Sequence, residues 1–311
     1  MGENLCVVLR QTAILFLLMG TGVLMRHRKV FDEASIKRIA DFVLLVVTPC
    51  LIVTSFQRPF DQSQLIGVCW SFGAAVFSHL LGILYSRIAV RDKEESARRT
   101  MRFATVFSNA GYMGLPLQYA ILGEVGVFYG SVYVVVFHML SWTYGIWEMR
   151  GGLKGESIAK MFFNPGLTGI AIGFPFFLFS AKLPSIIAEP VKMTGNLYTP
   201  LAMLVLGYYL GGAKFAPALK RRGSYVVFLL RHIAVPATVF TVLAFMPFLS
   251  REVAIAAIIP AAAPIGANIT VFAARYGVDA EFPSALVAVS TILSIITLPL
   301  TVSFALAFFH G

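Results

Sequence analysis

The stretch FSNAGYMGLPL, Phe107 to Leu117, decides how this chain folds, because it interrupts a helix inside an apolar run long enough to cross a bilayer. Gly111 and Gly114 loosen a helix, and Pro116 lacks a backbone N–H and disfavours a continuous helix by about 3 kcal/mol. Unpaired backbone survives in hydrocarbon only where it lines a protein cavity. The sequence therefore predicts a helix that ends near Gly111 and restarts near Leu115, with Pro116 in the first turn of the second half.

The composition indicates a polytopic membrane protein. The 311 residues are 58% hydrophobic and 13% charged, and the mean hydropathy is +0.80, values that soluble domains rarely reach. The net charge of +10 comes from short basic clusters between apolar runs, which is typical of cytoplasmic loops and argues against a nucleic-acid partner. The three cysteines show no C-x-x-C spacing and are expected to be small buried residues. We expect no metal site and no cofactor.

Ten apolar runs divide the chain, each long enough to span a bilayer core of about 30 Å. They lie approximately at 5–25, 38–57, 64–86, 101–121, 126–147, 164–181, 193–213, 224–248, 253–275 and 283–308. Alternate connections, beginning with 26–38, hold most of the Lys and Arg residues, and the other connections hold only Arg58, Lys182, Lys192 and Arg251. The basic set is predicted to be cytoplasmic, which places both termini outside the cell membrane.

The second half of the chain is similar to the first. A shift of about 150 residues places Thr199-Pro200 on Thr48-Pro49 and Gly266 close to Gly114. The pattern predicts two repeats of five helices, 1–149 and 164–311, joined by a short cytoplasmic linker at 150–163. Because each repeat makes an odd number of crossings, the repeats are expected to be inverted relative to each other, as in many secondary transporters.

Two half-helices are then expected to begin near the middle of the membrane. The segment AAAPIGANITVF is predicted to break between Pro264 and Asn268, through Gly266, with Asn268 as the N-cap of the helix that follows. Each N-terminus carries free N–H groups and roughly half a positive charge, which predicts a site for an anion. A pair of ordinary Pro/Gly kinks is the alternative.

Four segments together resemble the auxin efflux carrier family. They are SNAGYMGLPL, NPGLTGIAIG at 164–173, TPLAMLVLGYYL at Thr199–Leu210 and the segment from Pro260 to Leu300. This family includes bacterial malonate or malate permeases and the plant PIN-type carriers, and the absence of their long hydrophilic loop suggests a bacterial, inner-membrane member. The resemblance implies an all-α fold of ten helices in two inverted repeats, similar to the bile-acid symporters and sodium/proton antiporters. Helices 4 and 9 would be broken and would cross.

The resemblance also implies a division of labour. Helices 1, 2, 6 and 7 would form a scaffold domain, through which a homodimer is suggested, and helices 3–5 and 8–10 would form a transport domain. Asn109 falls on the asparagine that precedes the first crossover, and Pro116 on its proline. At the second crossover the plant carriers have a proline near the position of Ile269, where this chain has none, so Asn268 and Thr270 beside it depart from the family pattern.

Individual residues are assigned roles from this resemblance and from their chemistry. The residues expected to bind substrate are Ser108, Asn109, Gly114, Pro116, Asn268, Thr270, Thr48, Thr199 and Arg10. The residues expected to break helices are Gly111, Gly114, Pro116, Pro264 and Gly266. For Thr48 and Thr199, each followed by a proline, a kink in which the hydroxyl bonds a freed carbonyl is the alternative.

Charged residues are rare inside the apolar runs. Arg10 and Arg231 are the only basic ones well inside, and a charge at the bilayer centre costs about 2.5 to 3.5 kcal/mol, so each should be paired, functional or able to snorkel to the interface. The histidines of these runs, His79, His138 and His232, are expected to be hydrogen-bonded helix contacts. Asp41, Glu124 and Glu148 lie at or near the ends of runs, so no carboxylate is expected at the midplane.

The leading hypothesis is a secondary active or facilitative carrier of a small organic anion, such as a dicarboxylate or an auxin-like carboxylate, with H⁺ or Na⁺ as candidate coupling ions. A membrane sensor on the same fold and a cation-coupled antiporter are the alternatives, and the missing midplane carboxylate counts against the antiporter. An intramembrane enzyme is disfavoured because the chain has no H-E-x-x-H, no G-x-S-x-G and no paired intramembrane aspartates.

Overall fold

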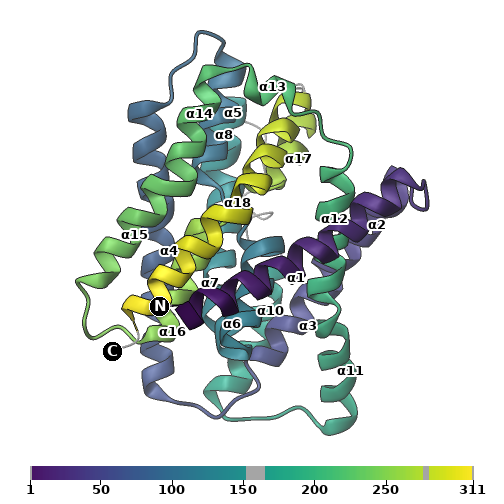
Figure 1. The fold of residues 1–311 in the computed structure, drawn as a ribbon. Helices are drawn as coiled ribbons and strands as arrows, with labels where there is room; N and C mark the ends of the chain where they lie inside the picture. The colour runs from purple at the N-terminus through teal and green to yellow at the C-terminus, as the bar shows by residue number, and fades with distance from the viewer. Residues whose placement is uncertain (1, 152–164, 276–279, 310–311) are drawn as a thin grey trace.

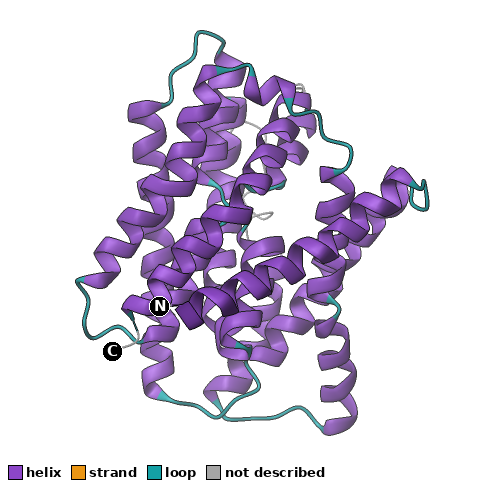
Figure 2. Cartoon of the chain, viewed as in Figure 1, coloured by secondary structure: helices purple, strands orange, loops and turns teal. Residues whose placement is uncertain are grey.

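The computed structural model describes residues 2–151, 165–275 and 280–309, and within these ranges the chain is helical (Figure 2). The α-helices are α1 (Gly2–His27), α2 (Glu33–Phe42), α3 (Thr48–Ser55), α4 (Gln62–Ala89), α5 (Glu95–Val106), α6 (Leu115–Leu122), α7 (Glu124–Leu140), α8 (Ile146–Arg150), α10 (Pro165–Leu178), α11 (Ser185–Asn196), α12 (Tyr198–Leu210), α13 (Ala216–Leu219), α14 (Arg222–Leu229), α15 (Val235–Ala244), α16 (Arg251–Ala262), α17 (Asn268–Arg275) and α18 (Glu281–Phe308). Four π-helical turns join successive segments: η1 (Val43–Val47), η2 (Ala110–Gly114), η3 (Ser141–Gly145) and η4 (Leu230–Ala234).

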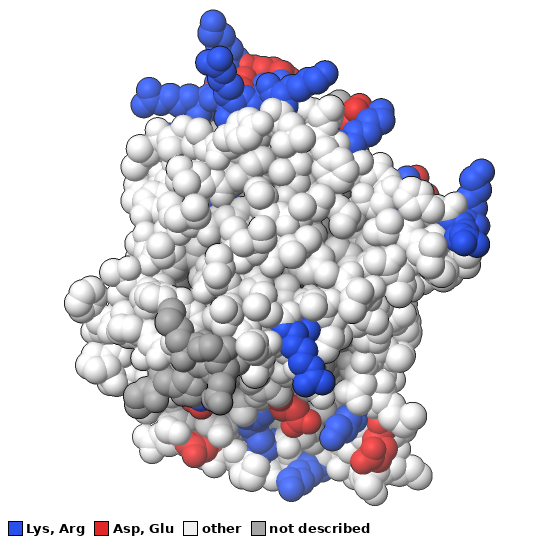
Figure 3. All heavy atoms as spheres, viewed as in Figure 1, with Lys and Arg blue, Asp and Glu red and all other residues white. Residues whose placement is uncertain are grey.

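Five helical segments of the described residues are long and apolar enough to cross a membrane. They are Leu5–His27, Gln62–Ala89, Glu124–Arg150, Arg222–Ala244 and Glu281–Phe308. Figure 3 shows the matching charge pattern: Lys and Arg gather at the upper end, mixed charges lie at the lower end, and the broad band between them is almost uncharged. This is the surface of a multi-pass membrane protein.

The helices pack in two groups (Figure 1). In the first group α1 packs along α12, and α3 packs against α10 and α11. The approach of α1 to α12 requires glycine, because a Cβ at Gly22 would lie 2.1 Å from the Leu204 carbonyl oxygen and one at Gly207 would lie 1.8 Å from that of Met19. The second group contains α4 to α8 and α14 to α18, in which α7 packs against both α4 and α16. Contacts of α1 with α18 and of α3 with α7 join the groups.

Prolines explain three of the four π-helical turns. A proline lies two residues after the end of each of three turns: Pro49 after η1, Pro116 after η2 and Pro236 after η4. A proline cannot donate to the preceding turn, and the helix widens so that the N–H groups before it reach one residue further back. The Thr48 N–H donates to the Val43 carbonyl, and the Thr48 hydroxyl donates to the same oxygen at 2.8 Å. The threonine therefore bonds a loosened carbonyl, as its position before a proline predicts.

The predicted linker at 150–163 lies outside the described residues from position 152 onward. The prediction of buried cysteines is wrong for Cys6 and Cys69, which are exposed on α1 and α4, whereas Cys50 is half-buried. An exposed position on a membrane-spanning helix faces hydrocarbon, where a thiol is accommodated as it is in a protein core.

Candidate functional site: the helix crossover

Two helices are interrupted within the second group. α5 ends at Val106, and the chain leaves the helix at 107–109 before η2 begins. α16 ends at Ala262, and the chain is unwound at 263–267 before α17 begins. We call these two segments, 107–109 and 263–267, the crossover. Nearly all of its residues are buried, so its backbone is shielded from lipid.

The two unwound segments satisfy each other's backbone. Ser108 and Ile265 form an isolated antiparallel β-bridge. The Asn109 N–H donates to the Pro264 carbonyl at 2.7 Å, and the Gly266 N–H donates to the Phe107 carbonyl at 2.9 Å. Inside a membrane protein, where no bulk water is present to accept these bonds, the pairing stabilises both breaks together.

The first break lies earlier in the chain than predicted. Gly111 and Gly114 belong to η2, so the predicted break at Gly111–Leu115 is wrong, whereas Pro116 does lie in the first turn of the following helix, α6, as predicted. The reason is that a π-helical turn accommodates Pro116 without ending the helix. The second break does lie at Pro264 and Gly266.

Asn109 is the last residue of the first unwound segment, and Asn268 directly follows the second. Asn109 directly precedes η2, is 4% exposed, and makes no side-chain capping bond. Asn268 is the first residue of α17, so it lies inside the helix and not before it, as an N-cap would. The Asn109 Nδ2 and both amide atoms of Asn268 are buried and have no hydrogen-bond partner in the part of the chain that the structure describes. Buried polar atoms without partners are uncommon, and these three mark candidate ligand contacts.

The start of α17 is less open than predicted. The Ile269 N–H donates to the Gly266 carbonyl at 3.3 Å, and the Thr270 N–H donates to the Ala267 carbonyl at 3.2 Å. The Thr270 hydroxyl also donates to Ala267, at 2.8 Å. The donors of Thr270 are therefore used within its own turn, whereas the amide atoms of Asn268 have no hydrogen-bond partner among the described residues.

The start of η2 faces the first group of helices. A Cβ at Gly111 would lie 3.6 Å from the hydroxyl oxygen of Tyr198 on α12. Tyr198 is 2% exposed and lies beside Thr48 of α3. The Tyr112 hydroxyl donates to the Ala40 carbonyl of α2 at 3.4 Å. The crossover thus reaches the boundary between the two groups through η2.

The other residues assigned to substrate binding are distributed unevenly. Ser108 is fully buried in the β-bridge, and the position of a Gly114 Cβ would be 3.6 Å from Pro260 of α16. Thr199 is half-buried in the first turn of α12, next to Tyr198. Arg10 is exposed on α1 and does not join the crossover.

Arg231 contacts the helix ends that lead into the crossover, a position that the sequence did not predict. It lies on η4 and is fully buried, so it does not snorkel to the interface. Its Nη1 donates to the carbonyls of Thr105 and Val106 at 3.2 and 3.3 Å, and its Nη2 donates to the carbonyl of Ala261. These carbonyls belong to the last turns of α5 and α16. The available signal was a lone arginine in an otherwise uncharged run, but the sequence does not show which helix ends it meets.

His232, the next residue, holds the second break from the other side. Its Nε2 lies 2.8 Å from the Ser290 hydroxyl of α18, and its Nδ1 lies 2.9 Å from the Thr297 hydroxyl. The Ser290 oxygen also accepts the Ile265 N–H at 2.9 Å. The prediction that this histidine is a hydrogen-bonded helix contact is confirmed, and the same is true of His79, whose Nδ1 lies 2.7 Å from the Ala75 carbonyl.

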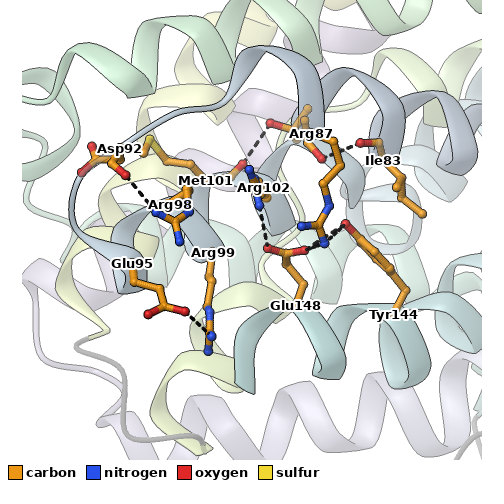
Figure 4. Close-up of polar contacts among 12 residues, drawn as sticks. Ile83, Arg87, Asp92, Glu95, Arg98, Arg99, Met101, Arg102, Tyr144 and Glu148 are labelled. Carbon is orange, nitrogen blue, oxygen red and sulfur yellow. Dashed lines mark hydrogen bonds and ion pairs between the residues drawn. The ribbon is translucent and has the colours of Figure 1, made fainter. Parts of the chain in front are cut away.

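A buried acidic residue, Glu148, joins α8 to α4 and α5 (Figure 4). Glu148 of α8 is 3% exposed, forms an ion pair with Arg87 of α4, and lies 3.9 Å from Arg102 of α5. The Tyr144 hydroxyl donates to the same carboxylate at 3.0 Å. No Asp or Glu occurs in residues 96–123 or 253–278, which contain both breaks. The charged side chain that bonds the ends of α5 and α16 is that of Arg231, which is positive.

Comparison with known proteins gives one family. The chain matches the model of a family described as membrane transport protein, over residues 7–162 and 153–302. No curated protein matches it. The matched ranges include both unwound segments, Arg231 and His232. The chain therefore belongs to the membrane transport protein family, which is that of the auxin efflux carriers, and it is a membrane transporter and not an enzyme.

Proposed function

We propose that this protein is a secondary active or facilitative carrier that binds a small organic anion at the crossover and moves it by alternating access. The observation that carries the proposal is the set of buried, unpartnered amide atoms of Asn109 and Asn268 at the starts of two helical segments. Helix N-termini carry partial positive charge, and an amide Nδ2 donates to carboxylate oxygens. No acidic side chain occurs near either break in the sequence to oppose an anion.

The substrate class follows from the donors. Amides, hydroxyls and helix N-termini suit a carboxylate of moderate size, such as a dicarboxylate or an aromatic carboxylate. The position of η2, which carries Tyr112, against Tyr198 of α12 adds aromatic surface at the boundary between the groups. In this proposal Asn109 is the principal donor, Asn268 is the second, and Ser108 shapes the backbone around them.

The architecture we propose is ten crossings in two inverted repeats, 1–149 and 164–311. The antiparallel direction of the bridge between Ser108 and Ile265 supports this, because inverted repeats bring corresponding breaks together in opposite directions. The first group of helices corresponds to the scaffold domain and the second to the transport domain. The basic end seen in Figure 3 supports a cytoplasmic placement of that end and extracytoplasmic termini. A homodimer through the scaffold domain stays a prediction.

The test is counterflow in proteoliposomes. Vesicles loaded with unlabelled malonate, malate or indole-3-acetate are given the labelled compound, and accumulation against its gradient is measured for the wild type and for Asn109→Ala. We expect saturable counterflow with at least one carboxylate and a decrease of about tenfold in the variant, which corresponds to about 1.4 kcal/mol. Asn196→Ala, at an exposed asparagine at the end of α11, is the control.

Two results would contradict the proposal. Saturable binding without counterflow would indicate a sensor on the same fold. Unchanged counterflow in Asn109→Ala would remove this residue from the site.

A further inference from the structure

We propose that Arg231 is the resident cation of the crossover and that transport by this protein therefore does not require Na⁺. In membrane carriers with broken helices, the carbonyls at half-helix C-terminal ends are the groups that coordinate a coupling cation. Here the guanidinium of Arg231 is bonded to those groups. The inference rests on the proposed function for its transport consequence, but the role of Arg231 in holding the crossover is testable without a substrate.

The geometry places one side chain on two helix ends. Nη1 of Arg231 bonds the carbonyls of Thr105 and Val106 in the last two residues of α5, and Nη2 bonds the carbonyl of Ala261 in the last turn of α16. These half-helices enter the crossover with their C-termini, each of which carries roughly half a negative charge. The single positive charge of Arg231 therefore matches the charge of the two ends it contacts.

Position and chemistry both favour arginine. Arg231 is fully buried, and moving an unpaired charge to such a place would be costly, so its contacts must be specific. The guanidinium presents donors in a planar fork that can bond two helix ends at once, whereas an ammonium is a point charge. The π-helical turn η4, which precedes Pro236, carries Arg231 and His232 on consecutive positions. From this turn, Arg231 bonds the helix ends that precede both unwound segments, and His232 lies against Ser290, whose oxygen accepts the Ile265 N–H of the second segment.

The consequence concerns energy coupling. A carrier whose half-helix C-termini are neutralised by a tethered cation keeps that charge in every step of its cycle. A bound Na⁺ at the same carbonyls would have to displace the guanidinium and would meet its positive charge. Arg231 is thus a positioning residue that acts through the crossover backbone.

The first experiment uses the wild type. Carboxylate uptake into proteoliposomes is measured in Na⁺, K⁺ and N-methylglucamine at equal ionic strength and pH, and the melting temperature of the purified protein is measured in the same salts. We expect uptake to agree within about twofold and the melting temperature to be insensitive to Na⁺, because no site is linked to the ion. A loss of about tenfold or more in uptake without Na⁺, or a saturable stabilisation by Na⁺, would overturn the inference.

The second experiment uses three variants. In Arg231→Gln the half-helix ends lose their cation, and we expect uptake to decrease about hundredfold and the melting temperature to rise on addition of Na⁺ but not of N-methylglucamine. Arg231→Lys keeps the charge and should retain uptake at least about tenfold above that of Arg231→Gln. Arg10→Gln, at the exposed arginine of α1, is the matched control and should behave as the wild type.

The outcomes separate this inference from the proposed function. Uptake by Arg231→Gln equal to that of the wild type in the absence of Na⁺ would overturn the role of Arg231. If no carboxylate is transported by the wild type, the proposed function fails, and the melting temperatures in Na⁺ and N-methylglucamine still decide whether Arg231 replaces a cation. If Arg231→Gln does not fold, the wild-type salt series and Arg231→Lys carry the test.

Discussion

At the scale of single residues, the crossover is held by side chains that replace the hydrogen bonds lost on unwinding. Ser290 is the clearest case: its hydroxyl oxygen accepts the Ile265 N–H at 2.9 Å and lies 2.8 Å from the His232 Nε2. If Nδ1 of His232 carries the proton and donates to Thr297, Nε2 accepts from Ser290, and every group in the chain of bonds is satisfied. The neutral imidazole thus fits this network.

Replacing Ser290 by alanine is therefore expected to destabilise the protein. The buried Ile265 N–H and the His232 Nε2 would both lose a partner, at a cost of about 1 to 3 kcal/mol for each group left unsatisfied. The free energy of unfolding, measured by denaturant titration in mixed micelles, should decrease accordingly in Ser290→Ala. Ser303→Ala is the matched control on the same helix, because the Ser303 hydroxyl is also buried but has no partner in the described residues. Equal effects of the two substitutions would show that the Ser290 network does not stabilise the break.

Single residues also mark the limit of what the sequence predicted. Asn109 was identifiable because an amide next to glycines and a proline in an apolar run has few structural uses. Arg231 was not, because the distance from an arginine to the end of its run suggests snorkelling, whereas burial depends on which helices surround it. Arg10, at a similar depth in its own run, is exposed. The two arginines look alike in sequence and differ only in their tertiary surroundings.

At the scale of elements, the helices of this protein do not break at the prolines that follow the π-helical turns. Pro49, Pro116 and Pro236 each follow a π-helical turn through which the helix continues. The unwound segment 107–109 lies before such a turn and owes its extended form to pairing with 263–267. Sequence pattern alone assigned the first break to Gly111–Leu115, because local propensity indicates where a helix is weak but not where another segment will pair with it.

Alanine substitutions of Gly266 and Gly114 are therefore expected to have different effects on transport. A Cβ at Gly266 would lie 2.9 Å from the backbone oxygen of Ser108 and 2.7 Å from the Asn268 Oδ1, so Gly266→Ala must displace the bridge or the amide. At Gly114 the nearest atom is a side-chain carbon of Pro260 at 3.6 Å, which is ordinary contact. We expect Gly266→Ala to lower carboxylate counterflow about tenfold or more and Gly114→Ala to change it by less than about twofold. A larger effect at Gly114 than at Gly266 would contradict the observed position of the second break.

At the scale of the whole molecule, few polar contacts among the described residues join the two groups of helices. The Glu124 carboxylate of α7 lies 3.8 Å from the Lys192 ammonium of α11, and both side chains are about half exposed. An exposed ion pair contributes at most about 1 kcal/mol, so it does not lock the groups together. Within the second group, by contrast, the buried Glu148 connects α4, α5 and α8 (Figure 4). This difference suits one rigid group that moves relative to another.

A cross-link between the groups should therefore stop transport. In a protein whose native cysteines are replaced, Glu124→Cys and Lys192→Cys are joined by a short bifunctional methanethiosulfonate. We expect carboxylate uptake to decrease about tenfold or more and to recover on reduction, because alternating access requires relative movement. The control pair Glu94→Cys and Arg221→Cys lies within the second group, where these residues form an ion pair at 2.6 Å, and its cross-link should leave uptake unchanged. Equal uptake with both cross-links would contradict movement between the groups.

Much of the molecular plan followed from the sequence. Apolar runs, the basic loops and the family resemblance predicted a helical membrane transporter, because hydrocarbon leaves a chain few ways to satisfy its backbone. The resemblance also named Asn109. The pairing of Ser108 with Ile265 and the bonds from Arg231 to the end of α5 could not be predicted, since both join segments more than a hundred residues apart.

The central claim, that an organic anion binds at the crossover, is tested most directly by equilibrium binding of a labelled carboxylate substrate to purified wild type and Asn109→Asp at pH 8. Two like charges about 5 Å apart repel by about 3 kcal/mol at an effective dielectric constant of 20. We predict that the variant binds at least about a hundredfold more weakly, while Asn196→Asp, at the exposed asparagine of α11, binds as the wild type does. Equal affinity of wild type and Asn109→Asp would contradict the account.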